Sequence, residues 1–429
     1  MKLGAAILGL CGAIAALVSG TFFMFASEVV GSIKASGLVT ADPATIKILA
    51  MIVAIPALLA GGILFAYPLI GGILFFITVE LMAFTMGFTS VTFAPIMLMA
   101  VASNLAVLCA QRERATPIIF LGFSIHQYLA LQIMVMLITV SPFVLYPVFL
   151  MKVLCFALFA CAFNLLIGYV GLLSFGHAAY FGMGGYAAGY AAKAWGWSPE
   201  LAMLFGMAAG GLLGIVFGWL AIRRQGISFA MITLALGQMA YFFCLQAPFT
   251  GGEDGIQQIP RGKLFGLISL QSDMAMYAVV AVVFLAGFLL IHRIVHSPFG
   301  QILKAIRENE PRATSLGYRT DSYKLVAFII SCALAGLAGG TKSLVFGIAT
   351  LTDVHNAMSG EVVLMTLLGG LGTIFGPVMG ALIATAMENY LAQAGAWVTV
   401  IQGAIFIACV IAFRKGVLGV LAEKLKIQL

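Results

Sequence analysis

The chain has 429 residues, of which 62% are hydrophobic and 9% charged, and its mean hydropathy is +1.12. Soluble domains carry about 25% charged residues, so this composition excludes an ordinary soluble protein and indicates a polytopic membrane protein. The formal net charge of +7 is explained by membrane topology without invoking nucleic acid.

Apolar segments recur along the whole chain. The first resembles a signal peptide, but its run is long for an h-region and lacks a convincing cleavage site, so we take it as a retained span. The predicted spans are 4–26, 48–66, 69–87, 91–110, 127–147, 149–169, 173–194, 201–222, 226–246, 274–292, 325–349, the two short segments 362–372 and 376–393, and 397–413.

Residues 1–115 are predicted to form an N-terminal membrane extension of about four spans. Glu80 is the one charged residue between positions 48 and 110. A mid-membrane carboxylate is costly and often functional, whereas one near the end of a span reaches the surface, and we favour the structural interpretation. The extension is either an accessory packing domain or a partner-binding module.

The distribution of basic residues predicts the orientation. With the N-terminus in the cytoplasm, fifteen Lys and Arg residues lie inside and seven outside, as the positive-inside rule requires. This count also places the C-terminus inside, provided that 362–393 is split into two short segments at Gly372–Pro377, where glycine and proline interrupt the helix.

Another interruption lies earlier in the chain, in the segment 164–190, which is apolar but broken by Ser174, Gly176 and His177. Irregular backbone at membrane depth survives only inside protein or beside a water-filled cavity, and paired broken segments are typical of transporter binding sites. Tight packing of glycine-rich helices explains the same pattern, and both interpretations stay open. By contrast, the glycines repeating every four residues at 206–218 predict helix packing alone.

Two polar segments separate the later spans. The loop 246–271 contains two acids in a turn-forming cluster, and it is a plain connector, a contact for an extracellular partner or a cap on the path. The segment 293–324 carries six basic residues; Ser297 and Pro298 predict the start of a helix that Pro311 interrupts and Gly317 ends. Alone, this second segment is explained as a solvated loop that fixes topology.

Three motifs together point to a known family. They are Asn164-Leu-Leu-Ile-Gly-Tyr-Val-Gly-Leu-Leu-Ser-Phe-Gly-His-Ala-Ala-Tyr-Phe-Gly-Met-Gly-Gly-Tyr186, Ser297-Pro-Phe-Gly-Gln-Ile-Leu-Lys-Ala-Ile-Arg-Glu-Asn-Glu-Pro-Arg-Ala-Thr-Ser-Leu-Gly317 and Leu367-Leu-Gly-Gly-Leu-Gly-Thr-Ile-Phe-Gly-Pro-Val-Met-Gly380. In this order they resemble permease subunits of the branched-chain amino acid ABC importer family, of the LivM type. The resemblance covers about residues 130–420 and is less specific for the substrate.

The resemblance implies an all-α polytopic permease core at 116–429 with discontinuous membrane segments, located in the bacterial inner membrane. It also implies a second homologous permease, two cytoplasmic ATPase subunits and a periplasmic solute-binding protein as partners, with ATP and Mg bound by the ATPases. The residues expected along the substrate path are Asn164, Ser174, Phe175, Gly176, His177, Gly372, Thr373 and Gly376.

ABC importers use a cytoplasmic loop of the form E-A-A-x-x-x-G to dock on the ATPase. Here only Ala313 and Gly317 match that form, and Pro311 and Arg312 depart from it, so individual contacts stay open. Coupling to the ATPase is expected at Glu308, Arg312, Ala313, Leu316 and Gly317.

Other chemistry finds no support in the sequence. The seven cysteines and five histidines form no metal or disulfide pattern, and Ala338–Ser343 lacks the second glycine of a P-loop, so we expect no cofactor, metal or catalytic residue in this chain. The alternative of another class is an ion-coupled secondary transporter, for which Glu80, Glu361 and His177 are the candidates. Within the family, urea, short amides or aromatic acids are alternative cargo.

Overall fold

Helices make up most of the computed structural model, which describes residues 72–74, 76–79, 102–103, 125–266, 268–391, 398–412 and 416–419. The chain divides into two units, Met1–Tyr146 and Pro147–Leu429. The predicted boundary at residue 115 and Glu80 lie outside the described residues, so both stay predictions.

The first unit is described chiefly through α6, Ile125–Val144, which covers residues 127–144 of the predicted span 127–147. Gln132 on this helix donates a hydrogen bond to the hydroxyl of Ser103 (3.2 Å), and Ser103 donates to the carbonyl of Gly72 (2.7 Å). These buried polar groups tie α6 to two earlier helical pieces of the extension. Hydrogen-bonded polar groups are the form in which such side chains are tolerated in an apolar interior.

The second unit contains the long helices and both predicted breaks. Its helices are α7 (Pro147–Asn164), the π-helix η1 (Leu165–Val170), α8 (His177–Ala194), α9 (Pro199–Ala221), α10 (Ile227–Gln246), α11 (Asp273–Val295), α12 (Pro298–Glu308), α13 (Glu310–Ser315), α14 (Thr320–Phe346), α15 (Asn356–Gly369), α16 (Gly376–Leu391) and α17 (Val398–Ala412). The predicted split of 362–393 into two short segments is confirmed, because α15 ends at Gly369 and α16 begins at Gly376.

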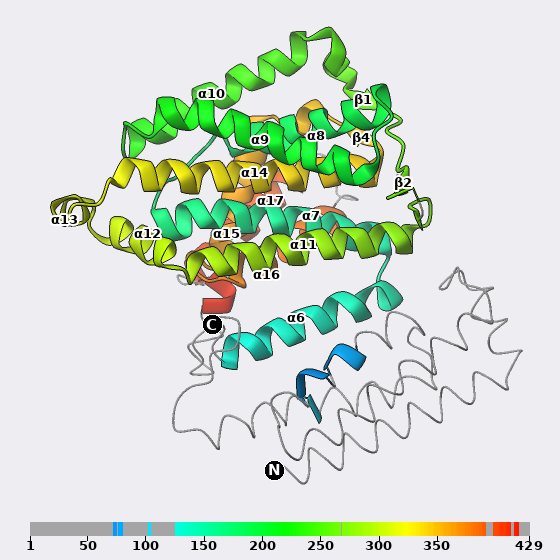
Figure 1. Cartoon of the computed structure of the whole chain (residues 1–429), viewed down its shortest axis with the longest axis horizontal. Coiled ribbons are helices and arrows are strands. Elements are labelled where there is room, and N and C mark those ends of the chain that lie inside the picture. Colours follow the sequence, from blue (N-terminus) through cyan, green and yellow to red (C-terminus); the bar gives the residue numbers. More distant parts are fainter. Residues whose placement is uncertain are drawn as a thin grey trace, which may run out of the picture. The chain divides into compact units, whose positions relative to one another are not determined.

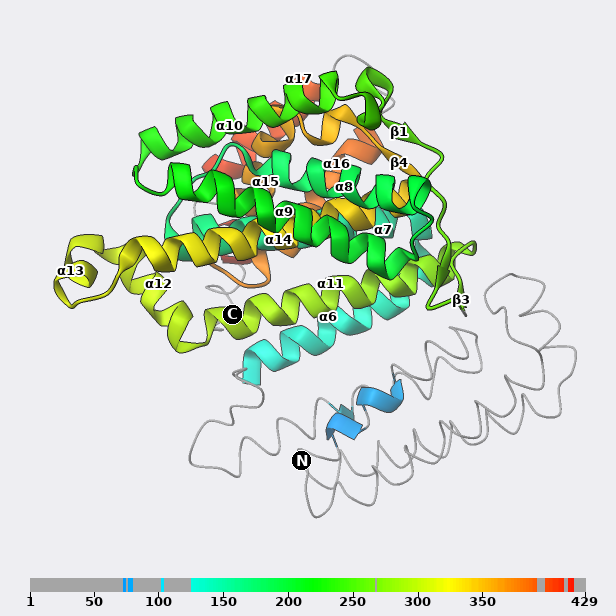
Figure 2. The same ribbon diagram turned by 45° about the horizontal axis from the view of Figure 1, so that its top comes forward.

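Short 3-10 turns and strands connect these helices. They are η2 (Pro248–Thr250), η3 (Gly252–Asp254), β1 (Ile256–Gln257), β2 (Lys263–Leu264), β3 (Ile268–Ser269), β4 (Ile348–Ala349) and η4 (Leu351–Asp353). Strand β1 pairs antiparallel with β4, and β2 pairs antiparallel with β3. Figures 1 and 2 show these strands at one end of the long helices and α12 with α13 at the other end.

Close glycine contacts hold the centre of this unit together. On α9, a side chain at Gly210 would lie 2.6 Å from the carbonyl oxygen of Cys332, and one at Gly218 would lie 2.8 Å from the ring of Phe328. The predicted packing role of the 206–218 glycines is therefore confirmed, since α9 lies against α14 along this ridge. The contact lets two backbones approach closely and places α14 in the middle of the helix layer.

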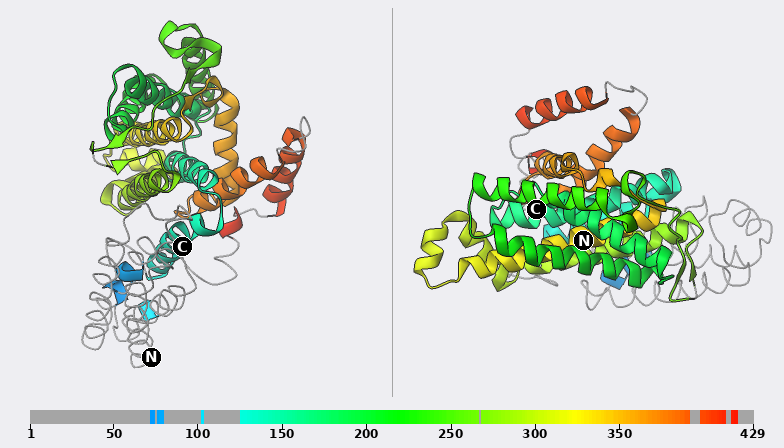
Figure 3. Two further views of the ribbon diagram at one scale, coloured as in Figure 1. Left: turned by 90° about the vertical axis from the view of Figure 1, so that its right-hand side faces the viewer. Right: turned by 90° about the horizontal axis from the view of Figure 1, so that it is seen from above.

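Five helices of the described chain are long and apolar enough to cross a membrane: Pro147–Val170, Pro199–Ala221, Ile227–Gln246, Asp273–Val295 and Thr320–Phe346. Large apolar side chains are exposed on α9 and α10, as at Leu212 (63%) and Met231 (65%). Exposed apolar faces of this extent are covered by lipid or by another protein. The helix content and these spans confirm the predicted all-α polytopic membrane fold. Figure 3 shows α16 and α17 to one side of the long helices.

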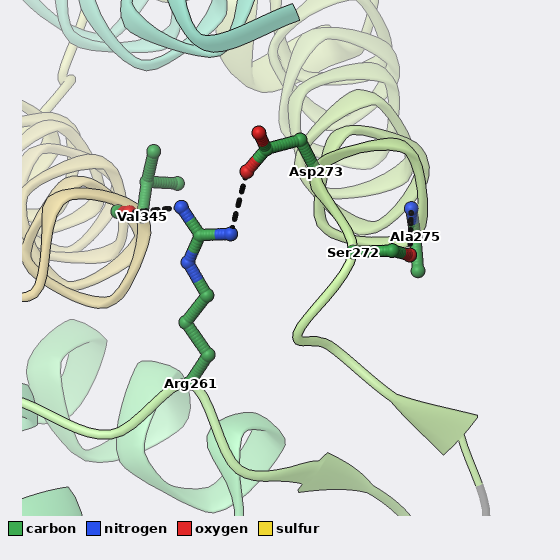
Figure 4. Close-up of polar contacts among 5 residues, drawn as sticks. All are labelled: Arg261, Ser272, Asp273, Ala275 and Val345. Atoms are coloured by element: carbon green, nitrogen blue, oxygen red, sulfur yellow. Dashed lines mark hydrogen bonds and ion pairs between the residues drawn. The ribbon is translucent and has the colours of Figure 1, made fainter. Parts of the chain in front are cut away.

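The loop between α10 and α11 is ordered by side-chain contacts. Arg261 donates to the Asp273 carboxylate (2.7 Å) at the start of α11 and to the Val345 carbonyl (3.0 Å) near the end of α14. Ser272 caps α11 by accepting from the backbone N–H of Ala275 (3.3 Å). Figure 4 shows how the Arg261 guanidinium lies between the two helix ends and holds the loop against both of them, while a role beyond that of a connector stays a prediction.

The segment after α11 differs in one detail from the prediction. Ser297 caps α12 and Pro298 occupies its first turn, as expected. The interruption lies at Asn309, however, and Pro311 belongs to the first turn of α13. The Asn309 side chain accepts a hydrogen bond from the N–H of Arg312 (3.1 Å), and proline is well tolerated in a first turn because its missing N–H has no helical partner there.

Candidate functional site

Asn164 joins the two interrupted segments. Its side-chain amide donates to the carbonyl of Thr373 (2.9 Å), and its side-chain oxygen accepts from the N–H of Gly372 (3.1 Å). Asn164 is 2% exposed, and its hydrogen bonds reach half-buried backbone groups that no regular helix satisfies. The structure thereby brings together three of the residues predicted for the substrate path.

The π-helix η1 begins directly after Asn164. A side chain at Gly168 would lie 2.8 Å from the N–H nitrogen of Gly372 and would overlap the Asn164 amide, so only glycine fits there. The turn ends at Gly171, whose φ of 84° is readily adopted by glycine. Single π-turns inside α-helices are frequent at functional sites because they break the regular hydrogen-bond ladder.

The second break, 370–375, is a tight glycine turn. Gly370 and Gly372 have φ values of 121° and 74°, which favour glycine. The Thr373 hydroxyl donates to the carbonyl of Gly370 (2.8 Å) and closes the turn. A side chain on Gly376 would overlap that hydroxyl. The turn is therefore fixed by its own backbone as well as by Asn164.

His177 lies in a closed aromatic shell. Its Nε2 is 2.9 Å from the Ser331 hydroxyl, and that hydroxyl donates to the carbonyl of Ala162 (2.5 Å). The ring is fully buried against the rings of Phe163 (5.1 Å between centroids) and Tyr180 (5.4 Å). This is the geometry of a packed histidine, and a direct contact with solute stays a prediction.

The neighbours of His177 are held by α10 and α15. The N–H of Phe175 donates to the Thr233 hydroxyl (3.2 Å), and the N–H of Ala178 donates to the Ser359 hydroxyl (2.9 Å). A side chain on Gly176 would overlap the carbonyl of Thr233. Ser174 and Gly176 are buried, so these two predicted path residues lie in a helix contact in this conformation.

An apolar cleft of about 410 Å³ opens beside the first break, residues 171–176 between η1 and α8. It lies between the break and the N-terminal half of α10 and is lined by Gly171, Leu172, Leu173, Phe175, Gly226, Ile227, Phe229, Ala230, Met231 and Leu234. Ligand sites are concave and mostly apolar, and this cleft has the size and lining to hold a small aliphatic side chain. Of the predicted path residues, Phe175 lines it.

The segment α12–α13 touches the same region. Arg307 on α12 donates from Nη1 to the carbonyl of Gly168 in η1, and the ammonium of Lys304 lies 5.7 Å from the centre of the Tyr169 ring. Charge-assisted hydrogen bonds of this kind are stronger than neutral ones. These contacts connect α12 to the π-turn, and the prediction from the sequence did not include either basic residue.

The predicted coupling residues fall into two groups. Ala313 is buried and packs α13 in place, whereas Glu308, Arg312, Leu316 and Gly317 are exposed. Leu316 is 71% exposed and presents an apolar side chain on the surface of this segment. Glu310 pairs with the buried ammonium of Lys324 and holds α13 against α14. The exposed residues therefore lie on or beside a helix, α13, that is fixed against α14.

No cluster of three or more His, Cys, Asp or Glu side chains suited to a metal occurs among the residues described. The expectation that this chain itself binds no cofactor stays a prediction. The sequence offered no local signal for Arg307, because it is one of six basic residues in 293–324 and its partner lies 139 positions earlier.

Comparison with known proteins gives a consistent set of relatives. High-affinity branched-chain amino acid transport system permease protein LivM of Escherichia coli K12 is 27% identical over 293 residues, covering 62% of this chain and 68% of the relative. The protein of the same name from Salmonella typhimurium LT2 matches to the same extent. Autoinducer 2 import system permease protein LsrC of Yersinia pseudotuberculosis serotype O:1b is 29% identical over 202 residues, which is 44% of this chain and 53% of the relative.

No solved structure matches the chain. The family model described as branched-chain amino acid transport system / permease component matches residues 145–410, a range that contains η1, the α12–α13 segment and both breaks. The chain therefore belongs to the family of permease components of branched-chain amino acid transport systems.

Proposed function

We propose that this chain is the permease subunit of an ATP-driven importer that moves branched-chain or related amino acids into the cytoplasm. The observation that carries the proposal is the attachment of α12 to η1 in a chain of this permease family. Gly168 and Asn164 then connect α12 to the 370–375 break. A displacement of α12 is in this way transmitted to both irregular segments.

The proposed complex contains a second homologous permease, two cytoplasmic ATPase subunits that bind ATP and Mg, and a periplasmic solute-binding protein. It lies in the bacterial inner membrane with the α12–α13 segment and both termini in the cytoplasm. Leu316, Arg312 and Glu308 supply an exposed apolar and charged surface for the ATPase. The exposed apolar faces of α9 and α10 are covered by lipid or by the second permease.

The proposed coupling is mechanical. Movement of an ATPase displaces α12, and Arg307 passes that displacement to the carbonyl of Gly168. Asn164 passes it on to Gly372 and Thr373. The two breaks shift together and expose the solute path, which includes the apolar cleft beside Phe175, alternately to the two sides.

The first experiment purifies the tagged chain gently from its own cell and identifies co-purifying proteins by mass spectrometry. ATPase subunits and a second permease are the expected partners. A chain that still arrives alone after controls for dissociation by detergent contradicts the proposal.

Uptake into membrane vesicles separates the proposal from an ion-coupled secondary transporter. ATP depletion stops the proposed importer, whereas an ionophore stops a secondary transporter. Labelled leucine, urea, acetamide and benzoate, supplied in turn, separate amino acids from the other cargo of the family. Uptake that survives ATP depletion and stops with the ionophore refutes the importer function.

A further inference from the structure

Two ion pairs lie close to α15 in the second unit. Lys152 on α7 pairs with Glu388 on α16 (2.9 Å), and Lys342 on α14 pairs with Asp353 in η4. The Lys342 ammonium also lies 5.4 Å from the centre of the Phe156 ring, a favourable cation–π distance. Each of these two ammonium groups already has its own carboxylate.

Glu361 on α15 adds a third carboxylate to this group. The charges that act on it are those of Glu388, Lys152, Lys342 and Asp353. Within the described part of the chain, its carboxylate has no hydrogen-bond or ion-pair partner. Three carboxylates and two ammonium groups leave one negative charge uncompensated, and a partly buried charge is costly unless a cation or a proton neutralises it.

One face of α15 is open beside Glu361. A side chain at Gly360 would meet no atom within 4 Å, Ala357 is exposed, and Leu364 is half-buried. Residues three and four apart share a helix face, so these positions form one stripe with Glu361 at its middle. A small molecule can therefore reach the carboxylate along a face whose other members are apolar.

We propose that Glu361 binds the primary ammonium group of the transported solute, whose apolar side chain lies along Ala357, Gly360 and Leu364. This assignment rests on the proposed function and narrows it. A carboxylate and an ammonium form a strong charge-assisted hydrogen bond, whereas urea, short amides and aromatic acids carry no cation for Glu361. The site thus selects apolar amino acids among the cargo considered for this family.

The test measures binding of L-leucine to the detergent-purified complex without its solute-binding protein, by saturation-transfer-difference NMR. Glu361→Gln keeps the shape of the side chain and removes its charge, and it is expected to weaken leucine binding at least tenfold. 4-Methyl-2-oxopentanoate has the leucine skeleton without the ammonium group, and its weak signal is expected to be the same in both proteins.

The matched control is the double variant Lys152→Met with Glu388→Gln. It removes a whole ion pair from the same cluster, leaves the net charge unchanged and is expected to bind leucine within threefold of wild type. Glu361→Gln that binds leucine like wild type overturns the inference. The inference is also overturned if the double variant loses leucine affinity as strongly as Glu361→Gln, because any change of charge in the cluster then weakens binding.

Native mass spectrometry of Glu361→Gln tests the remaining explanation, which is that Glu361 contacts the second permease and not the solute. If the variant loses the second permease, Glu361 pairs with a cation of that partner and the inference is overturned. ATP-driven leucine uptake by the wild-type complex is measured in parallel. Uptake with unchanged binding by Glu361→Gln refutes this inference alone, whereas Glu361-dependent binding without ATP-driven uptake refutes the proposed function alone.

Discussion

Asn164 shows how a single side chain holds two irregular segments. Its amide presents a donor to Thr373 and an acceptor to Gly372, and both partners are backbone groups that lie outside the helical ladder. An unmet hydrogen bond in a buried site costs about 1–3 kcal/mol. The amide is therefore a better choice at this position than any apolar or charged group of similar size.

Replacing Asn164 by Asp tests this role. The carboxylate keeps an acceptor for Gly372 but turns a second acceptor toward the carbonyl of Thr373. We expect a loss of about 1–3 kcal/mol of stability and at least a tenfold drop in uptake. Thermal unfolding of the purified complex and vesicle uptake measure the two effects. Asn389→Asp makes the same chemical change at an exposed position and should alter neither, and an unchanged Asn164→Asp would speak against the bridge.

Gly176 offers a second test at the residue scale. An added methyl group overlaps the Thr233 carbonyl, so Gly176→Ala is expected to separate α8 from α10 and lower the melting temperature and the uptake rate. Gly403→Ala is the control, because a side chain there meets no atom within 4 Å. A helical glycine changed to alanine in open space should gain about 0.5–1 kcal/mol. Equal melting temperatures for the two variants would contradict the close packing of Gly176 against the Thr233 carbonyl.

At the scale of elements, α12 is a short helix that contacts the π-turn through the Lys304 ammonium and, by a hydrogen bond, through the Arg307 guanidinium. Arg307→Ala removes that contact but leaves Ser297, Asn309 and the Glu310–Lys324 pair, which hold the segment in shape. ATP hydrolysis by the complex should therefore continue, while uptake per ATP falls at least fivefold.

The control for this variant is Arg319→Ala. Arg319 is exposed on the same connecting segment, and its side chain makes no hydrogen bond to the described residues. Uptake per ATP should stay at the wild-type value in Arg319→Ala. If both arginine variants behave alike, the contact of Arg307 with Gly168 plays no part in coupling.

The helices themselves were largely predictable. Apolar stretches bounded by charged residues, glycine and proline gave most ends of α7 to α11 and α14 to within a few residues, and Pro377 with its neighbouring glycines marked the start of α16. The π-helix η1 was not predictable, because Leu165–Val170 has the composition of any apolar helix. Its extra residue per turn follows from the contacts of Asn164 and Gly168, which the local sequence does not encode.

At the scale of the whole molecule, the candidate site depends on contacts between distant segments. The sequence predicted that both breaks matter, but it gave no means to pair Asn164 with Gly372 or Arg307 with Gly168. Those pairs are separated by 208 and 139 positions. The same holds for Glu361, whose electrostatic neighbours come from α7, α14, η4 and α16.

The proposed orientation makes a prediction for the whole molecule. The two variants are Ser315→Cys on α13 and Glu253→Cys on η3, and both positions are exposed. Figure 1 shows α13 and β1, the strand that follows η3, at opposite ends of the long helices. A membrane-impermeant maleimide added to intact spheroplasts should label the cysteine at 253 and should reach the one at 315 only after lysis. The wild-type chain measures the background labelling of its own seven cysteines, of which Cys155, Cys161, Cys244 and Cys332 are buried. The reverse labelling pattern would contradict the proposed orientation and place α13 outside the cytoplasm.

The Asn164 bridge also bears on how the protein is made. A chain that is still being synthesised inserts η1 into the membrane long before Gly372 and Thr373 leave the ribosome, because 208 residues separate the partners. Until then the amide of Asn164 has to be satisfied by water or by a transient neighbour. The first break therefore matures late, and a chain cut short before residue 370 leaves an open polar site that the quality control of the cell can recognise.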